Sequence, residues 1–149
     1  MATIRPAARA DLDALFALEL QTFPEESYGE IALRQFIDLF PGLFFVAEDA
    51  GTIAGYGLGG IDQQGQGWVL SLGVSPAYQG QGIGARLFDA VLDALRGTGA
   101  IRLTVIPDNV RAVTLYERKG FTTEARVEDY YGPGQHRLVM VRLTPDEPR

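Results

Sequence analysis

The sequence predicts an α+β (mixed α/β) fold, with a central, mostly antiparallel twisted sheet of about seven strands and about four helices. Apolar residues recur at helical spacing in four longer segments, and they alternate or run continuously in shorter ones. Turns rich in glycine and aspartate separate several of the shorter segments, which is typical of antiparallel hairpins. Since the chain has 149 residues, we expect a single domain over residues 1–149.

The first part of the chain predicts a strand followed by two helices. A short strand is expected over residues 2–6. Asp11 is a candidate N-cap for a helix that ends at Phe23-Pro24. Apolar residues return at helical spacing over residues 31–40, and Pro41-Gly42 ends this second helix.

The pattern then changes to three strands joined by polar turns. These strands are expected over residues 43–48, 52–60 and 68–74. The turns between them are glycine-rich and hydrophilic, as in a meander of antiparallel strands.

The second half predicts helices that alternate with strands. Helices are expected over residues 82–96 and 109–119, and each is followed by a glycine. Strands are expected over residues 101–106, 121–127 and 137–143. The polar tail, residues 144–149, is expected to fray.

Composition excludes several classes of site. The chain has 13 Lys and Arg against 19 Asp and Glu, a net charge of -6, which argues against a nucleic-acid partner. An acidic surface could attract a cationic amine, or it could serve only solubility. With no cysteine and one histidine, we expect no disulfide, no cysteine nucleophile and no metal. No segment has the apolar length of a signal peptide or membrane span, so we expect a cytoplasmic protein with no membrane partner.

The most informative segment is the glycine-rich turn Gln79-Gly80-Gln81-Gly82-Ile83-Gly84, between a predicted strand and a predicted helix. The first N–H groups of a helix are unpaired and lie at the positive end of its dipole, so this turn is a candidate diphosphate site. Its glycine spacing differs from the Rossmann fingerprint, and it lacks the lysine of a Walker loop. A flexible connection without a ligand is the alternative.

Two blocks of sequence resemble the GNAT N-acetyltransferase superfamily. Gln79 to Gly84 is similar to its Q/R-x-x-G-x-G/A signature, and Asn109 to Phe121 is similar to its N-x-x-A-x-x-L-Y-x-x-x-G-F block. The order and separation of the blocks, and the order of the elements over the whole chain, are also similar. The resemblance implies a GNAT-like fold whose fourth and fifth strands splay apart, and an enzyme that transfers the acetyl group of acetyl-CoA to a primary amine.

The resemblance also implies which residues bind the cofactor. The strand residues would pair with the pantetheine arm, and the turn would hold the pyrophosphate. Asn109 could instead be a simple N-cap. The expected cofactor-binding residues are Leu72, Gly73, Val74, Gln79, Gly80, Gln81, Gly82, Ile83, Gly84, Ala85, Asn109, Ala112, Tyr116 and Lys119.

The implied chemistry is direct attack by an amine. Tyr116 would be the general acid that protonates the departing CoA thiolate, although it could instead be a packed aromatic residue. The backbone N–H of Val74 would stabilise the oxyanion. Thr104 stands where some relatives have a glutamate base, and threonine cannot take that role. A water chain to Glu19, Glu26 or a tyrosine is one alternative.

Two further segments resemble the ribosomal-protein-alanine N-acetyltransferase branch of the superfamily, namely Glu19 to Tyr28 and Asp129 to Gly134. They imply substrate contacts by Glu19, Phe23, Tyr28, Tyr130 and Tyr131. The acceptor would then be a protein N-terminus, with lysine side chains, small amines and amino sugars as alternatives. A non-catalytic acyl-CoA-binding module and a nucleotide-binding oxidoreductase are the rival functions, and the chain could be a monomer or a homodimer.

Overall fold

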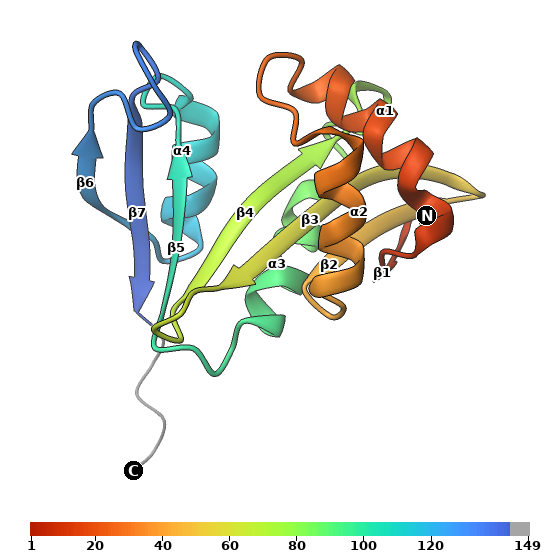
Figure 1. Ribbon diagram of the computed structural model, residues 1–149, viewed down its shortest axis with the longest axis horizontal. Coiled ribbons are helices and arrows are strands. Elements are labelled where there is room, and N and C mark those ends of the chain that lie inside the picture. Colours follow the sequence, from red (N-terminus) through yellow and green to blue (C-terminus); the bar gives the residue numbers. More distant parts are fainter. Residues whose placement is uncertain (144–149) are drawn as a thin grey trace. The chain divides into compact units, whose positions relative to one another are not determined.

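The computed structural model describes residues 1–143, so the predicted fraying of residues 144–149 lies outside the described part of the chain. Four helices and seven strands follow one another nearly as the sequence predicts, with ends shifted by a residue or two (Figure 1). The helices are α1 (Leu12–Thr22), α2 (Gly29–Leu39), α3 (Ile83–Ala94) and α4 (Val110–Arg118). The strands are β1 (Thr3–Pro6), β2 (Phe44–Asp49), β3 (Thr52–Ile61), β4 (Gly67–Val74), β5 (Ala100–Val105), β6 (Thr122–Val127) and β7 (Arg137–Leu143).

The strands form one sheet in the order β1-β2-β3-β4-β5-β7-β6. The pairs β1–β2, β2–β3, β5–β7 and β6–β7 are antiparallel. The pair β4–β5 is parallel, with Gly67 opposite Ile101 and Trp68 opposite Arg102. The predicted fold class is therefore confirmed, while the splay between these two strands stays a prediction.

The chain forms two compact units, which are described one at a time. The first contains Met1–Gly60 and Val69–Leu95, and the second contains Ile61–Trp68 and, within the described part of the chain, residues 96–143. The single-domain organisation over residues 1–149 stays a prediction. No helix in residues 1–143 has the length and apolar character needed to cross a bilayer.

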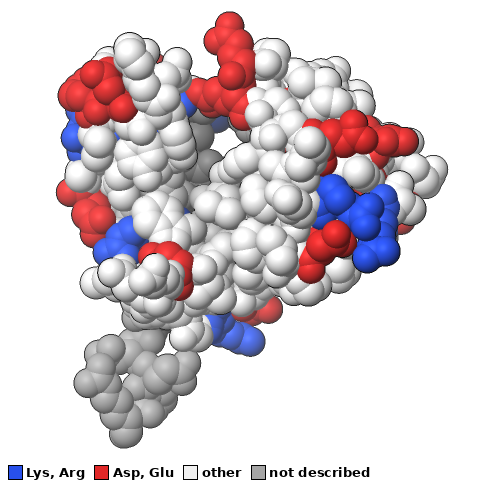
Figure 2. Space-filling model, in the orientation of Figure 1, with Lys and Arg blue, Asp and Glu red and all other residues white. Residues whose placement is uncertain are grey.

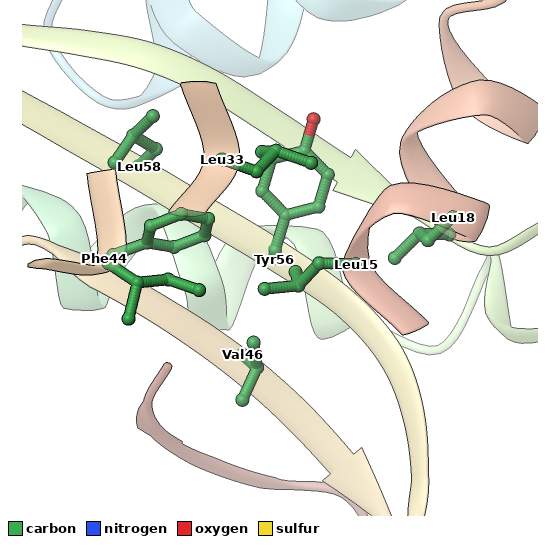
Figure 3. Packing of buried hydrophobic residues seen from close by; sticks show 8 residues of the cluster. Leu15, Leu18, Leu33, Phe44, Val46, Tyr56 and Leu58 are labelled. Carbon is green, nitrogen blue, oxygen red and sulfur yellow. The ribbon is translucent and has the colours of Figure 1, made fainter. Parts of the chain in front are cut away.

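In the first unit, α1 and α2 pack on one face of β2 and β3. Side chains from these four elements form a buried apolar cluster, with the ring of Tyr56 among them (Figure 3). Its buried members are Leu15, Leu18, Leu33, Ile37, Phe44, Val46, Tyr56 and Leu58. Because side chains alternate along a strand, the neighbours of Phe44 and Val46 belong to the opposite face.

Helix α3 packs on that opposite face, where Ile83 and Leu87 join Ala47 in a second cluster. Two glycines of β3 allow this close approach. A Cβ on Gly55 would lie 2.8 Å from the carbonyl oxygen of Gly73 and 3.0 Å from Leu87 Cδ1. A Cβ on Gly57 would lie 3.0 Å from Val91 Cγ2. The glycines of β3 therefore set how close α3 lies to the sheet.

Asp11 occupies the N-cap position of α1, as expected, but its side chain does not cap the helix. A short 3-10 turn, Arg9–Asp11, comes before α1, and the Asp11 side chain makes no cap hydrogen bond to that helix. Its carboxylate instead accepts the Ala8 N–H at 2.7 Å and two hydrogen bonds from Arg5, at 2.8 and 2.9 Å. The sequence could not show that β1 would bring Arg5 to this carboxylate.

The Arg5–Asp11 pair leads to a prediction about stability and pH. Hydrogen bonds from Arg5 hold the pKa of Asp11 below its ordinary value, so the ionised carboxylate stabilises the folded state above that value. We expect Asp11→Asn to lower the free energy of unfolding by about 1–3 kcal/mol at pH 7. The difference from wild type should shrink as the pH falls through the lowered pKa. Urea titrations at a series of pH values measure it, and a difference that does not change with pH would contradict the assignment.

The second unit is built on β5, β7 and β6. Ile101, Leu103, Phe121 and Met140 are buried in it. The turn before β4 is held by Asp62, which accepts hydrogen bonds from the Trp68 indole at 2.9 Å and from backbone N–H groups of the turn.

Candidate functional site

The glycine-rich turn joins the end of β4 to the start of α3 in the first unit. Gly80 and Gly82 have φ angles of +82° and +80°, which glycine adopts readily and most other residues do not. A Cβ on either residue would meet no atom within 4 Å, so the space beside both is open. The turn is therefore shaped by its backbone and leaves room for a ligand.

The N–H groups that open α3 are available to an anion at this turn. The first hydrogen bond of the helix runs from the Arg86 N–H to the Gly82 carbonyl, at 3.1 Å. The N–H groups of Ile83, Gly84 and Ala85 come before that bond, at the positive end of the helix dipole. These groups fit a phosphate or diphosphate.

The turn is docked against the end of β4. Gln79 Nε2 donates a hydrogen bond to the Val74 carbonyl, at 3.3 Å. A Cβ on Gly84 would lie 3.4 Å from Val74 Cγ2, so the helix begins in contact with this strand. The structure thus brings the predicted residues Gln79 and Gly84 to Val74, within one unit.

The predicted substrate residues of the first unit lie at the α1–α2 connection. Glu19 has an exposed fraction of 1%. Its Oε1 accepts hydrogen bonds from Ser27 Oγ, at 2.8 Å, and from the Tyr28 N–H. Its Oε2 lies 3.5 Å from the Tyr56 hydroxyl, which donates to it. The carboxylate of Glu19 is therefore bound by this chain's own donors.

The sequence did not indicate that Tyr56 and Ser71 join the hydrogen-bonded side chains around Glu19. The Tyr56 hydroxyl and Ser71 Oγ are 2.8 Å apart. Burial raises the pKa of Tyr56, and its bond to Ser71 acts in the opposite sense. The signal that could have found the pair is the lone tyrosine in an apolar, glycine-rich strand, because a buried tyrosine hydroxyl needs a polar partner.

Two aromatic rings lie against β4 at Gly73. A Cβ there would be 2.9 Å from Tyr56 Cε1 and 3.4 Å from Phe23 Cε2. Tyr28 is also tied to this strand, because its hydroxyl donates to the Leu70 carbonyl at 3.1 Å. The structure therefore brings the predicted residues Phe23, Tyr28 and Gly73 into one neighbourhood.

Tyr116 and the N-terminus of α4 belong to the second unit. Tyr116 is partly buried, and its ring centroid lies 6.4 Å from that of Phe121. Burial raises the pKa of the phenol, so it keeps its proton at neutral pH. Asn109 caps α4, with its Oδ1 accepting the Ala112 N–H at 3.1 Å, and the N-cap alternative is thus confirmed. The carbonyl of Lys119 accepts a hydrogen bond from Arg142, at 3.1 Å.

The tyrosines Tyr130 and Tyr131 also lie in the second unit, with ring centroids 4.7 Å apart in an edge-to-face arrangement. The buried Arg137 places its guanidinium carbon 5.1 Å from the Tyr131 ring centroid. The Tyr131 hydroxyl is 3.4 Å from Thr104 Oγ1, within hydrogen-bonding distance, so Thr104 is paired with a predicted substrate residue.

Acidic side chains are exposed at several places on the molecular surface. Figure 2 shows several separate acidic groups on one face, in keeping with the net charge of -6. Within residues 1–143, no group of three or more histidine, aspartate or glutamate side chains is arranged to hold a metal ion.

The chain is similar to known acetyltransferases over most of its length. The family model described as "Acetyltransferase (GNAT) family" matches residues 12–121. An uncharacterized N-acetyltransferase of Methanocaldococcus jannaschii is 31% identical over 96% of this chain and 92% of its own length. N-alpha-acetyltransferase RimI of Mycobacterium tuberculosis is 35% identical, over 87% of this chain and 84% of its own. The crystal structure of Ard1 from Thermoplasma volcanium has a TM-score of 0.87 at 26% identity, covering 97% of this chain and 99% of that chain.

Proposed function

Since this chain belongs to the acetyltransferase (GNAT) family and is an acetyl-CoA-dependent N-acetyltransferase, we propose that it acetylates the α-amine of a protein or peptide. The main support is that two features lie against one strand, β4. One is the open, glycine-shaped turn at the start of α3, and the other is the pair of aromatic residues Phe23 and Tyr28. A rival oxidoreductase function does not fit this family.

The turn before α3 holds the diphosphate of acetyl-CoA in this proposal. The N–H groups of Ile83, Gly84 and Ala85 supply the donors, and the positive φ angles of Gly80 and Gly82 shape the loop around the phosphates. Leu72, Gly73 and Val74 pair with the pantetheine arm through main-chain atoms. Asn109, Ala112 and Lys119 are further proposed cofactor contacts.

Tyr116 is the general acid of the proposed reaction. The neutral amine nitrogen forms a bond to the acetyl carbonyl carbon, and the carbon–sulfur bond breaks. The departing thiolate takes the proton of the Tyr116 phenol. The amine nitrogen loses one proton to solvent water as the amide forms, and solvent returns a proton to Tyr116 after it has acted. The Tyr116 phenol carries its proton across the neutral range, because its pKa lies above the ordinary value near 10, and a general acid must be protonated before it acts.

The N–H of Val74 stabilises the oxyanion that forms on the acetyl oxygen. The hydrogen bond from Gln79 to the Val74 carbonyl supports the assignment, because it ties the main chain at this residue to the turn. A preorganised donor of this kind acts by stabilising charge that appears only in the transition state.

An α-amine is favoured over a lysine side chain for two reasons. Its pKa, near 8, leaves a larger neutral fraction at pH 7 than the lysine pKa near 10.4. The chain is also similar to a protein named an N-alpha-acetyltransferase. Phe23, Tyr28, Tyr130 and Tyr131 are the proposed contacts for the first residues of the acceptor.

The test is acetylation of matched peptides, followed by mass spectrometry. One peptide has a free N-terminus and no lysine, and its partner has a blocked N-terminus and one lysine. We expect kcat/KM to be at least about 100-fold higher for the free N-terminus, in line with the difference between the two amine pKa values. Faster acetylation of the lysine peptide, or of small amines such as amino sugars, would overturn the α-amine proposal.

A further inference from the structure

We infer that Glu19 is a positioning residue, whose buried carboxylate holds the segment Phe23–Tyr28 in its acceptor-binding conformation before any acceptor arrives. The inference rests on the proposed function, because that function places Phe23 and Tyr28 at the acceptor. Glu19 itself would then touch no substrate, and its effect would pass through Ser27, Tyr28 and Tyr56.

The first step is the burial of the carboxylate. Glu19 is 1% exposed, and a buried carboxylate is costly unless donors of the protein bind it. Two of its donors, Ser27 Oγ and the Tyr28 N–H, belong to the segment itself. If the segment moved away, the carboxylate would lose both donors. The cost of burying Glu19 therefore favours the docked segment over alternative conformations.

The second step links this carboxylate to β4. The Tyr56 hydroxyl contacts Glu19 Oε2 at 3.5 Å and Ser71 Oγ at 2.8 Å. The Tyr28 hydroxyl donates to the Leu70 carbonyl at 3.1 Å. The segment is thus tied directly to Leu70 through Tyr28, and indirectly to Ser71 through Glu19 and Tyr56. These two residues of β4 come immediately before Leu72, where the proposed pantetheine contacts begin.

The third step concerns the aromatic side chains that these hydrogen bonds hold against β4. The rings of Phe23 and Tyr56 lie so close to Gly73 that a Cβ there would be 3.4 Å and 2.9 Å from them. The Tyr28 ring packs edge-on against Phe36 of α2, with centroids 5.1 Å apart. These side chains are held before binding, which reduces the ordering cost that an acceptor would otherwise have to overcome.

A positioning role has a kinetic signature that a loss of fold would not have. The turn before α3 contains none of these residues, and the proposed pantetheine contacts on β4 are made by main-chain atoms, so acetyl-CoA affinity should depend little on Glu19. Acceptor binding should depend on it. Loss of the carboxylate should therefore raise KM for the acceptor while KM for acetyl-CoA stays within about twofold.

The experiment compares Glu19→Ala with Glu25→Ala, a matched control that removes the same charge from an exposed position of the same segment. We expect kcat/KM for the acceptor peptide to fall about tenfold or more in Glu19→Ala and less than about twofold in Glu25→Ala. Glu19→Gln keeps an oxygen for Ser27 and Tyr28, and it should recover most of the loss. Tyr56→Phe should lower kcat/KM less in the Glu19→Ala background than in wild type, because Tyr56 and Glu19 belong to one chain of hydrogen bonds.

Hydrogen exchange separates this inference from the proposed function. Without any acceptor, the backbone N–H groups of residues 23–28 should exchange faster in Glu19→Ala than in Glu25→Ala or wild type. This readout holds even if the acceptor is not an α-amine. Equal exchange in the two variants would overturn the inference. A fall in acetyl-CoA affinity as large as the fall in acceptor affinity would overturn it as well.

Discussion

Gly82→Asp should abolish the binding of acetyl-CoA at concentrations where the wild-type protein is saturated. Gly82 has a φ of +80°, and the space where its Cβ would lie is open, so the new carboxylate would sit in the proposed phosphate site. Two like charges about 4 Å apart repel by roughly 4 kcal/mol at an effective dielectric constant of about 20. The expected loss of affinity is therefore about 100-fold or more, measured by calorimetry.

Gly82→Asn is the matched control for this variant. Asparagine has nearly the same shape as aspartate, and both tolerate a positive φ better than other residues with a side chain. The affinity of the Gly82→Asn variant for acetyl-CoA should fall by less than about tenfold, because only the backbone strain and the bulk of the asparagine side chain oppose binding. If the two variants lost affinity equally, charge would not be the cause and the phosphate site would lie elsewhere.

Tyr116→Phe should lower kcat by about 100-fold or more, in the range expected for loss of a general acid. The phenylalanine ring can keep the contact with Phe121, so the fold and the affinity for acetyl-CoA should change little. Single-turnover measurements of acetyl transfer at saturating acetyl-CoA report this change directly. An unchanged single-turnover rate would show that Tyr116 is a packing residue and not the acid.

The pH dependence of wild type gives an independent check on Tyr116. An acid works only while it is protonated, and burial raises the pKa of this phenol above its ordinary value near 10. Ionisation of Tyr116 should therefore cause no loss of activity below about pH 10. Any fall in rate at lower alkaline pH should persist in Tyr116→Phe, since it must come from another group.

The parts of this protein that the sequence alone determined are those that depend on residues close together in the chain. Helical spacing in α3, the glycines of its preceding turn and the Asn109 cap each follow from a few neighbouring residues. The two motif blocks identified the family for the same reason, since each lies within a short stretch. The order of the strands in the second unit could not be predicted in this way, because β7 lies between β5 and β6 in the sheet, out of chain order.

Only the tertiary structure decided which polar side chains meet across the sheet. Asp11 satisfies the criteria for a helix cap, yet it bonds to Arg5 of a neighbouring strand. The sequence is compatible with a solvent-exposed Glu19, yet this side chain is buried and bound by Ser27 and Tyr28. The physical reason is that a hydrogen bond between distant residues depends on strand register and helix packing, which bring residues as far apart as Tyr56 and Glu19 within reach.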